Sequence, residues 1–299
     1  MNKLKISEQY RNLQVEICEK LEALDNGIKF IEDPWNRNEG GGGFTRTVEN
    51  GQILEKGGVA FSEVHGELTQ QMKTQLRMTG NSFFACGVSI VLHPLHPLHP
   101  IIHMNVRYFE LDSGEYWFGG GIDLTPHYIN EGLAKKFHEG LKSFCDSYDT
   151  SLYPEFKRNA DDYFFLPHRG ESRGIGGVFY DHKHHENCPL TKEQLLDFSY
   201  NLGLLFPRLY SEQIQSAKVM EPSLSEINWQ RLRRGRYVEF NLLHDRGTKF
   251  GIYSGGRTES ILLSMPPQAD WKYNFIPESN SEEEKTLELL KKRIDWISH

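Results

Sequence analysis

Apolar and polar residues alternate with two different periods along the chain, and together these periods indicate an α+β protein. Helical spacing of apolar residues is clearest near 7–25, 62–77, 131–147, 191–217, 222–234 and 282–297. Strand-like runs, several of which end at glycine, lie near 87–92, 101–111, 115–123, 175–181, 237–245, 249–254 and 259–265. Because short turns join several strands, the pattern predicts an antiparallel sheet with helices packed on it. We expect a single domain over residues 1–299, with an N-terminal helix region in residues 1–35.

One predicted strand has a polar face. In IHMNVRYF, the residues His103, Asn105 and Arg107 point to one side because side chains alternate along a strand. Such a row is costly in an apolar core, so this face is either solvated or lines a polar binding site.

The next residues predict a hairpin that decides what faces this row. If Asp112, Ser113 and Gly114 form a three-residue turn, Arg107 lies opposite Gly119 and His103 lies opposite Asp123. The floor beside the polar row would then be flat enough for a broad planar ligand. A two-residue turn would instead move Asp123 to the other face.

Four histidines lie within the eleven residues from 93 to 103. The prolines of HPLHPLHP favour an extended backbone of three residues per turn, which aligns His93, His96 and His99 along one edge. This cluster could be a metal site, a rigid arm or half of a catalytic pocket. His96 and His99 could equally belong to an exposed proline-rich turn, whereas His93 ends an apolar run and could face a cavity.

Two glycine-containing segments suggest loops. The segment NEGGGGFTRT, at 38–47, lacks the G-K-[ST] ending of a phosphate loop and is interpreted as a flexible loop that could act as a lid. Further along, Arg257 follows two glycines, where it could grip a carboxylate while the glycines let a ligand approach the backbone. Asp245 and Arg246 read as an ordinary turn with a surface ion pair.

Composition narrows the class of protein. The 299 residues are 38% hydrophobic and 25% charged, as in soluble globular proteins, and no apolar run is long enough for a transmembrane segment. The net charge of −7 argues against a nucleic-acid surface. The four cysteines are far apart and form no C-x-x-C pair, which favours reduced thiols in a cytoplasm. The first residues also lack the apolar core of a secretory signal.

Four blocks of sequence carry a specific resemblance to a known family. They are HPxxPxxPxxHMNVRYFE, WFGGGIDLTP, DDYFFLPHRGESRGIGGVF and GRYVEFNLLHDRGTKFGIYSGGRTESILLSMPP. In this order they resemble the oxygen-dependent coproporphyrinogen III oxidases of haem biosynthesis, with similarity from about Gly40 to Trp296. The resemblance implies a large, rather flat antiparallel sheet with helices on both faces, and a homodimer paired through residues 237–272.

The resemblance also implies the reaction. Two propionates of coproporphyrinogen III would be oxidatively decarboxylated to vinyl groups, giving protoporphyrinogen IX and consuming O2. No haem, flavin or nicotinamide is implied. Four rim carboxylates on this substrate call for arginines such as Arg107 and Arg257, and its central N–H groups call for an acceptor such as Asp123 or Asp245.

Site residues follow from the resemblance by position. Substrate contacts are implied for Ser89, Asn105, Val106, Arg107, Gly255, Gly256 and Arg257. Catalytic roles are implied for His103, as proton donor, and for Asp123, Asp245 and Arg246. Bacterial members are described as binding a divalent metal, with Mn2+ the candidate here, through histidines that match His93, His103, His138 and His168. The local sequence instead indicates that His138 is a helix-surface histidine.

The chain departs from the family pattern at a few positions, and two other functions stay open. The departures are His96, His99, Tyr180 and His182, which add histidines near the pocket. A His-rich non-haem metal oxygenase is one alternative, although only His103 and Asp123 suggest ligands. The other is a tetrapyrrole or metal carrier that binds without turnover.

Overall fold

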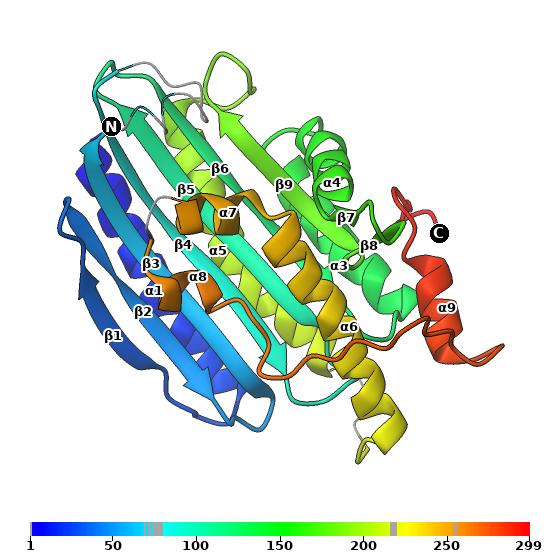
Figure 1. Ribbon diagram of the computed structural model, residues 1–299. Coiled ribbons are helices and arrows are strands. Elements are labelled where there is room, and N and C mark those ends of the chain that lie inside the picture. Colours follow the sequence, from blue (N-terminus) through cyan, green and yellow to red (C-terminus); the bar gives the residue numbers. More distant parts are fainter. Residues whose placement is uncertain (1, 69, 71–72, 74–79, 216–219, 254–255) are drawn as a thin grey trace.

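The computed structural model describes all residues except 1, 69, 71–72, 74–79, 216–219 and 254–255. The described part contains a large sheet of seven antiparallel strands, in the order β1-β2-β3-β4-β5-β6-β9 (Figure 1). Its strands are β1 (Ile31–Asn36), β2 (Gly41–Glu49), β3 (Leu54–Glu67), β4 (Ser82–Pro94), β5 (Ile101–Leu111), β6 (Tyr116–Thr125) and β9 (Gly176–Lys183). A small second sheet pairs β7 (Phe165–Leu166) with β8 (Glu171–Ser172). The predicted single-domain α+β fold is therefore confirmed.

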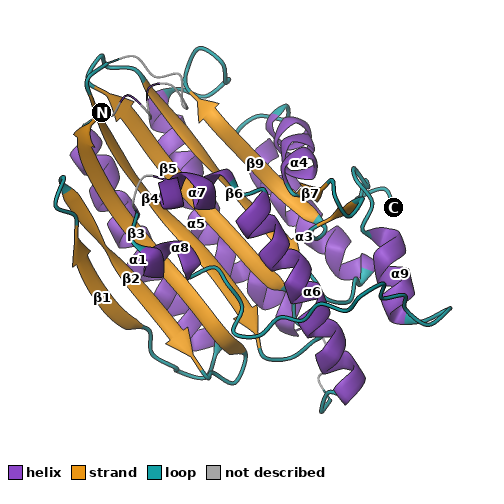
Figure 2. Ribbon diagram, viewed as in Figure 1, coloured by secondary structure: helices purple, strands orange, loops and turns teal. Residues whose placement is uncertain are grey.

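Helices cover both faces of the large sheet (Figures 1 and 2). One face carries α1 (Lys3–Leu24), α3 (Glu131–Asp146), α4 (Leu152–Tyr163) and α5 (Lys192–Gln215). The opposite face carries α6 (Leu224–Leu243), α7 (Arg246–Tyr253) and α8 (Thr258–Leu262), and α9 (Glu282–Leu289) lies near the C-terminus. None of the helices described is long and apolar enough to cross a membrane.

The alternation along β5 separates the two faces. Met104, Val106 and Tyr108 are fully buried in the main core, together with apolar residues of α1 and α5. His103 and Arg107 point the opposite way, toward α6 and α7, and are only partly buried. The sheet thus has one apolar face and one polar face, as the period-two pattern predicts.

The predicted three-residue hairpin turn is also confirmed. The Leu111 backbone N–H donates to the Glu115 carbonyl at 2.8 Å, and Gly114 adopts a φ of 87°, which a glycine reaches without steric cost. Consequently Arg107 pairs with Gly119 and His103 pairs with Asp123.

Three strands expected near the C-terminus are wrong. The ranges 237–245, 249–254 and 259–265 lie in or overlap α6, α7 and α8. Their β-branched and aromatic residues favour strands locally, but the segment is helical, and Tyr237 and Phe240 of α6 pack on residues of the sheet. Gly235 of α6 lets another part of the chain pass closely, since a Cβ there would lie 2.5 Å from the Asp270 carbonyl oxygen.

The N-terminal third also differs from the expectation. The predicted loop at 38–47 largely forms β2, whose glycines allow close packing: a Cβ on Gly43 would lie 2.6 Å from the Trp35 ring. Residues 62–67 of the predicted helix at 62–77 belong to β3, and much of the remainder lies outside the described residues. Nothing in the sequence pattern indicated β1 or α4.

Candidate active site

Small side chains form the surface of the polar face of the sheet. The strand register aligns Ala60, Ser89, Asn105 and Gly121 across β3 to β6. A neighbouring row aligns Gly43, Ser62, Gly87, Arg107 and Gly119. We call this surface the small-residue floor; its members are Gly43, Ala60, Ser62, Gly87, Ser89, Gly119 and Gly121. It provides the flat surface that the hairpin register predicts.

Two arginines reach this floor, one from its β1–β2 edge and one from β5. Arg257 precedes α8 and reaches the β1–β2 edge, where it pairs with Asp33 and lies 3.5 Å from the Thr45 hydroxyl. Arg107 projects from β5, three strands away from the strand of Thr45. With strands spaced by about 4.8 Å, this separation is roughly 14 Å. The two cations thus flank the part of the floor on β3 and β4, and their separation suits the width of a large planar ligand.

A hydrogen-bonded chain of polar side chains runs along the other end of the floor. His103 Nδ1 lies 2.7 Å from Asp123 Oδ1, and Arg173 donates to Asp123 Oδ2 at 2.6 Å. On the far side of the imidazole, His103 Nε2 lies 3.4 Å from Asn105 Nδ2, and Arg107 donates to Asn105 Oδ1 at 3.0 Å. The hairpin register makes this chain possible because it places these strand residues on one face.

The chain continues to β9 through Asp181. Its carboxylate lies 2.8 Å from Arg107 Nη2 and 3.7 Å from Arg246 Nη2. Burial alone would raise the pKa of Asp181, but a hydrogen bond from His182 and the charge of Arg107 outweigh it and lower the pKa well below its usual value. Gly119 makes room for the pair, because a Cβ there would lie 2.7 Å from Arg107 Nε.

Asp123 is held as a carboxylate in the same way. Burial of its side chain, which is 2% exposed, would raise the pKa, but the Arg173 charge and the His103 hydrogen bond lower it below the usual value. Both carboxylate oxygens already accept a hydrogen bond from a protein donor.

Asp245 and Arg246 lie where α6 passes into α7. Asp245 accepts from the Tyr163 hydroxyl at 2.8 Å and from the Thr248 backbone N–H at 2.6 Å, so it caps the start of α7. Arg246 lies over the Tyr163 ring, 4.9 Å from its centroid, and its side chain is largely exposed toward Asp181. They form more than an ordinary surface turn, because Arg246 joins the polar chain.

The remaining sequence-predicted substrate residues do not all lie on the polar face of the sheet. Ser89 lies exposed on the floor beside Asn105. The Val106 side chain lies on the opposite, apolar face and is fully buried. Gly256 hydrogen-bonds through its N–H to the Gly251 carbonyl at 2.8 Å. Gly255 lies outside the described residues.

The four histidines expected to bind a metal are not brought together. No group of three or more His, Cys, Asp or Glu side chains in the described part of the chain is placed to hold a metal ion. His138 is 0% exposed and both ring nitrogens are occupied, one by the Tyr153 hydroxyl at 3.0 Å and one by the Ile175 carbonyl at 2.9 Å. The prediction that His138 lies on a helix surface is therefore wrong.

The other histidines of this set also have protein partners. His93 is buried, with Nε2 2.9 Å from the Ser264 carbonyl oxygen. His168 lies 2.8 Å from a Glu239 oxygen through Nε2 and 3.0 Å from His244 through Nδ1. With His103 bound to Asp123, the four residues present do not fit a shared metal site.

The proline-rich arm is buried rather than exposed. His96 and His99 are 9% and 4% exposed. His96 Nδ1 accepts from the Leu98 N–H at 3.1 Å, and Nε2 lies 2.7 Å from the Met220 carbonyl oxygen. The interpretation of these two histidines as an exposed turn is wrong, because the arm packs under the start of α6.

The structure adds residues that the sequence did not assign. These are Arg173, which pairs with Asp123, and Asp181, which pairs with Arg107. A signal existed for Asp181: in the predicted strand 175–181 it shares a face with Gly177 and Phe179, which pair with Asp123 and Gly121.

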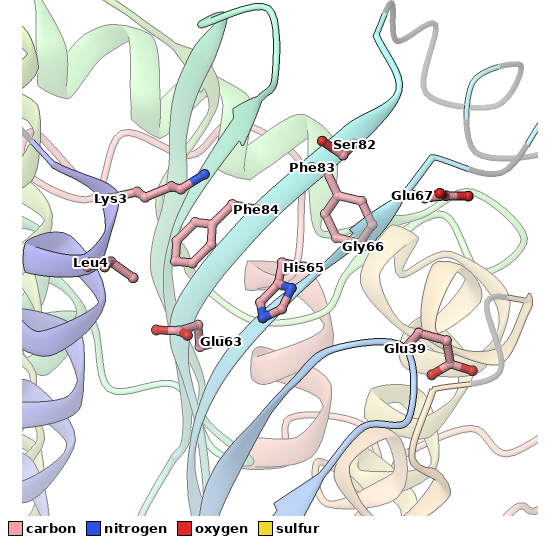
Figure 3. A pocket seen from close by; sticks show the side chains of 10 residues that line it. All are labelled: Lys3, Leu4, Glu39, Glu63, His65, Gly66, Glu67, Ser82, Phe83 and Phe84. Carbon is pink, nitrogen blue, oxygen red and sulfur yellow. The ribbon is translucent and has the colours of Figure 1, made fainter.

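A pocket of about 560 Å³ lies elsewhere, between the start of α1 and the ends of β3 and β4. Figure 3 shows side chains from these elements around it, including Lys3, Glu63, His65 and Phe84. It contains none of the sequence-predicted site residues. Glu63 accepts a hydrogen bond from Ser7 there and thereby joins α1 to the sheet.

Comparison with known proteins shows similarity over nearly the whole chain. Residues 5–296 match the family model for coproporphyrinogen III oxidase. The oxygen-dependent coproporphyrinogen-III oxidase of Drosophila melanogaster is 46% identical over 95% of this chain and 76% of its own length. The human mitochondrial and Prochlorococcus marinus (strain NATL2A) enzymes of that name are 43% and 44% identical, over 95% and 96% of this chain and 65% and 88% of theirs. The chain belongs to the coproporphyrinogen III oxidase family.

Proposed function

We propose that this protein converts coproporphyrinogen III to protoporphyrinogen IX with O2 as the oxidant. The observation that carries the proposal is the small-residue floor with arginines on two sides, in a chain that belongs to this family. A porphyrinogen is broad, and its rim carries four carboxylates. The floor suits the macrocycle, and the flanking guanidinium groups suit the carboxylates.

The chemistry requires few protein groups. Each of two propionates loses CO2 from its end and the equivalent of a hydride from the carbon beside the pyrrole, which leaves a vinyl group. O2 accepts the electrons, and no organic cofactor is indicated. The side chains therefore position the substrate, exclude water and handle protons.

The aspartates that pair with the arginines of the site indicate what these arginines would bind. Arg107 and Arg257 each pair with an aspartate, Asp181 and Asp33 respectively, which occupy them as a substrate carboxylate would. Substrate propionates would replace or share these partners. Arg246 approaches the same Asp181 from α7 and suits a third carboxylate.

His103 is proposed as the residue that exchanges a proton with the substrate. Its imidazole projects from β5 beside Asn105 and is held from behind by Asp123. Because the Asp123 side chain is buried behind His103, we assign Asp123 to orienting His103. Asp245 is then the better candidate for contact with pyrrole N–H groups, since it is only partly buried.

Two further features belong to the proposal. The exposed apolar residues Leu242, Leu243, Ile252 and Leu262 lie in or near α6 to α8 and support a homodimer formed through residues 237–272. All four cysteines are unpaired, which suits a reducing compartment such as the cytoplasm. A bound Mn2+ is not part of the proposal, because the four-histidine set does not fit one.

The direct test supplies coproporphyrinogen III to the purified protein with and without O2. We expect protoporphyrinogen IX, CO2 release and O2 uptake in air, and unchanged substrate under nitrogen. Tight substrate binding without O2 uptake would instead establish a carrier. Turnover that depends on stoichiometric iron would establish a metal oxygenase.

A further inference from the structure

Arg173 is among the most deeply buried charged residues of the chain, with 2% of its side chain exposed. It lies between β8 and β9, and its guanidinium sits over three aromatic rings. The distances to the centroids of Phe164, Tyr237 and Phe240 are 4.4, 4.6 and 4.5 Å. Burying a cation in such surroundings is costly unless a specific anion pairs with it.

That anion is Asp123. Arg173 Nη2 donates to Asp123 Oδ2, and the other carboxylate oxygen faces His103 Nδ1. Arg173 Nη1 also donates to Asn241 Oδ1 at 3.2 Å, which ties the guanidinium to α6. Arg173 therefore touches neither the floor nor His103, and it can act on His103 only through Asp123.

We propose that Arg173 is a positioning residue that fixes the tautomer of His103. An ionised Asp123 can only accept hydrogen bonds, so the proton of the neutral imidazole must sit on Nδ1. Nε2 is then the unprotonated nitrogen, and it lies on the side of the ring next to Asn105. This role rests on the proposed function, in which His103 exchanges its proton with the substrate through Nε2.

Loss of the Arg173 charge reverses this arrangement. A buried Asp123 without its cation takes up a proton, and a protonated carboxyl can donate to Nδ1. The imidazole proton then moves to Nε2, so the neutral ring presents a donor to the substrate instead of an acceptor. The change affects proton transfer without altering any residue of the floor.

The test follows the ring nitrogens of His103 by 15N NMR of the full-length protein, with signals assigned from His103→Gln. In the wild-type protein we expect the Nδ1–H tautomer. Arg173→Met should shift His103 toward Nε2–H and lower kcat/KM roughly 100-fold, as for loss of acid–base catalysis. Arg173→Lys keeps the charge, so it should retain the Nδ1–H tautomer and part of the activity.

Arg233→Met is the matched control. Arg233 is as deeply buried as Arg173 and pairs with a carboxylate, Glu171, at 2.9 Å, away from His103. Its replacement should lower the melting temperature as Arg173→Met does, but leave the His103 tautomer unchanged. The inference is overturned if Arg173→Met keeps Nδ1–H, or if Arg233→Met shifts His103 equally.

Misfolding of a variant and failure of the proposed function can each be distinguished from failure of this inference. If Arg173→Met does not fold, Arg173→Lys decides, and a shift to Nε2–H in that charged variant overturns the proposal. If the wild-type protein has no oxidase activity, the proposed function fails, yet the NMR result still decides whether Arg173 sets the tautomer.

Discussion

The polar chain is a row of hydrogen-bonded and ion-paired side chains with a buried end and an accessible end. The chain runs through Arg173, Asp123, His103, Asn105, Arg107, Asp181 and Arg246. Its buried end, at Arg173 and Asp123, fixes geometry, and its more accessible end, at Arg107 and Arg246, is where we propose that substrate binds. Removing one residue of this row leaves its neighbour with an unpaired charge or an unmade hydrogen bond. A single substitution should therefore change the free energy by more than the loss of one contact.

Arg107→Ala should lower kcat/KM by roughly 30- to 1,000-fold, equivalent to about 2–4 kcal/mol of transition-state binding. The reason is that a substrate carboxylate loses a charge-assisted partner on the floor. Arg107→Lys should recover only part of the loss, because lysine lacks the planar fork. Steady-state kinetics with coproporphyrinogen III measures both.

Arg208→Ala is the control for this substitution. Arg208 is an exposed arginine of α5, 3.7 Å from Glu212, on the opposite face of the sheet. Its removal should leave kcat/KM unchanged. An Arg107→Ala enzyme with the efficiency of the Arg208→Ala enzyme would remove Arg107 from the site.

The candidate site is built from two parts, the floor formed by strands and the helices that cover it. Strands β2 to β6 hold the small residues in register, while α6 to α8 bring Arg246 and Arg257 over the floor. Contacts from this helical segment to the sheet include Lys56 Nζ to the Met265 carbonyl, at 2.9 Å. Leu263 also packs so closely on Gly58 that a Cβ on this glycine would lie 2.5 Å from it.

Ser89→Phe should therefore block the floor without unfolding the protein. Ser89 is exposed, so a larger side chain meets no core, but it would occupy the surface on which the macrocycle lies. We expect KM to rise tenfold or more, about 1.4 kcal/mol of binding, with an unchanged melting temperature. Ser143→Phe, at an exposed site of α3, should change neither quantity. Normal KM in Ser89→Phe would place the substrate elsewhere.

The whole molecule combines an apolar core on one face with several buried neutral histidines. Burial lowers the pKa of His127 and His138 to about 3, and that of His99 to about 4. An unfolded histidine has a pKa of about 6.5. Between these values the unfolded chain binds protons that the folded chain does not. The stability from these histidines is therefore complete above about pH 6.5 and is lost as the pH falls toward 4.

We thus expect the free energy of unfolding to fall steeply from pH 7 to pH 5, with each such histidine contributing up to about 1.4 kcal/mol per pH unit. Urea unfolding at several pH values measures the slope. His138→Asn should reduce the slope by one histidine's contribution, whereas His299→Asn, at a partly exposed site, should not. A flat profile from pH 7 to pH 5 in the wild-type protein would contradict the assignment.

The proposed homodimer is also a property of the whole molecule, and its mass in solution tests it. Sedimentation should give twice the mass of the 34.7 kDa chain at micromolar concentration. Leu243→Glu places a charge among the exposed apolar residues of this surface and should favour the monomer. Glu212→Lys, on the opposite face, is the control. A wild-type monomer would rule out the dimer at that concentration.

The sequence by itself determined the hairpin at the centre of the site. A period-two run and a three-residue turn are local features, so they predicted that His103 faces Asp123 and Arg107 faces Gly119. The family blocks added which positions to consider. Alternation and turn chemistry depend on residues close in sequence, so they can be derived without the fold.

Only the tertiary structure decided what surrounds this hairpin. The segments of α6, α7 and α8 that follow residue 236 have strand-like composition but form helices, and Tyr237 and Phe240 of α6 pack on sheet residues far away in sequence. His138 and His96 read as surface positions locally, yet long-range packing buries them and engages their ring nitrogens. The contact of Arg173 with Asp123 likewise spans 50 residues. Burial and charge pairing are properties of distant segments brought together, so no local pattern could reveal them.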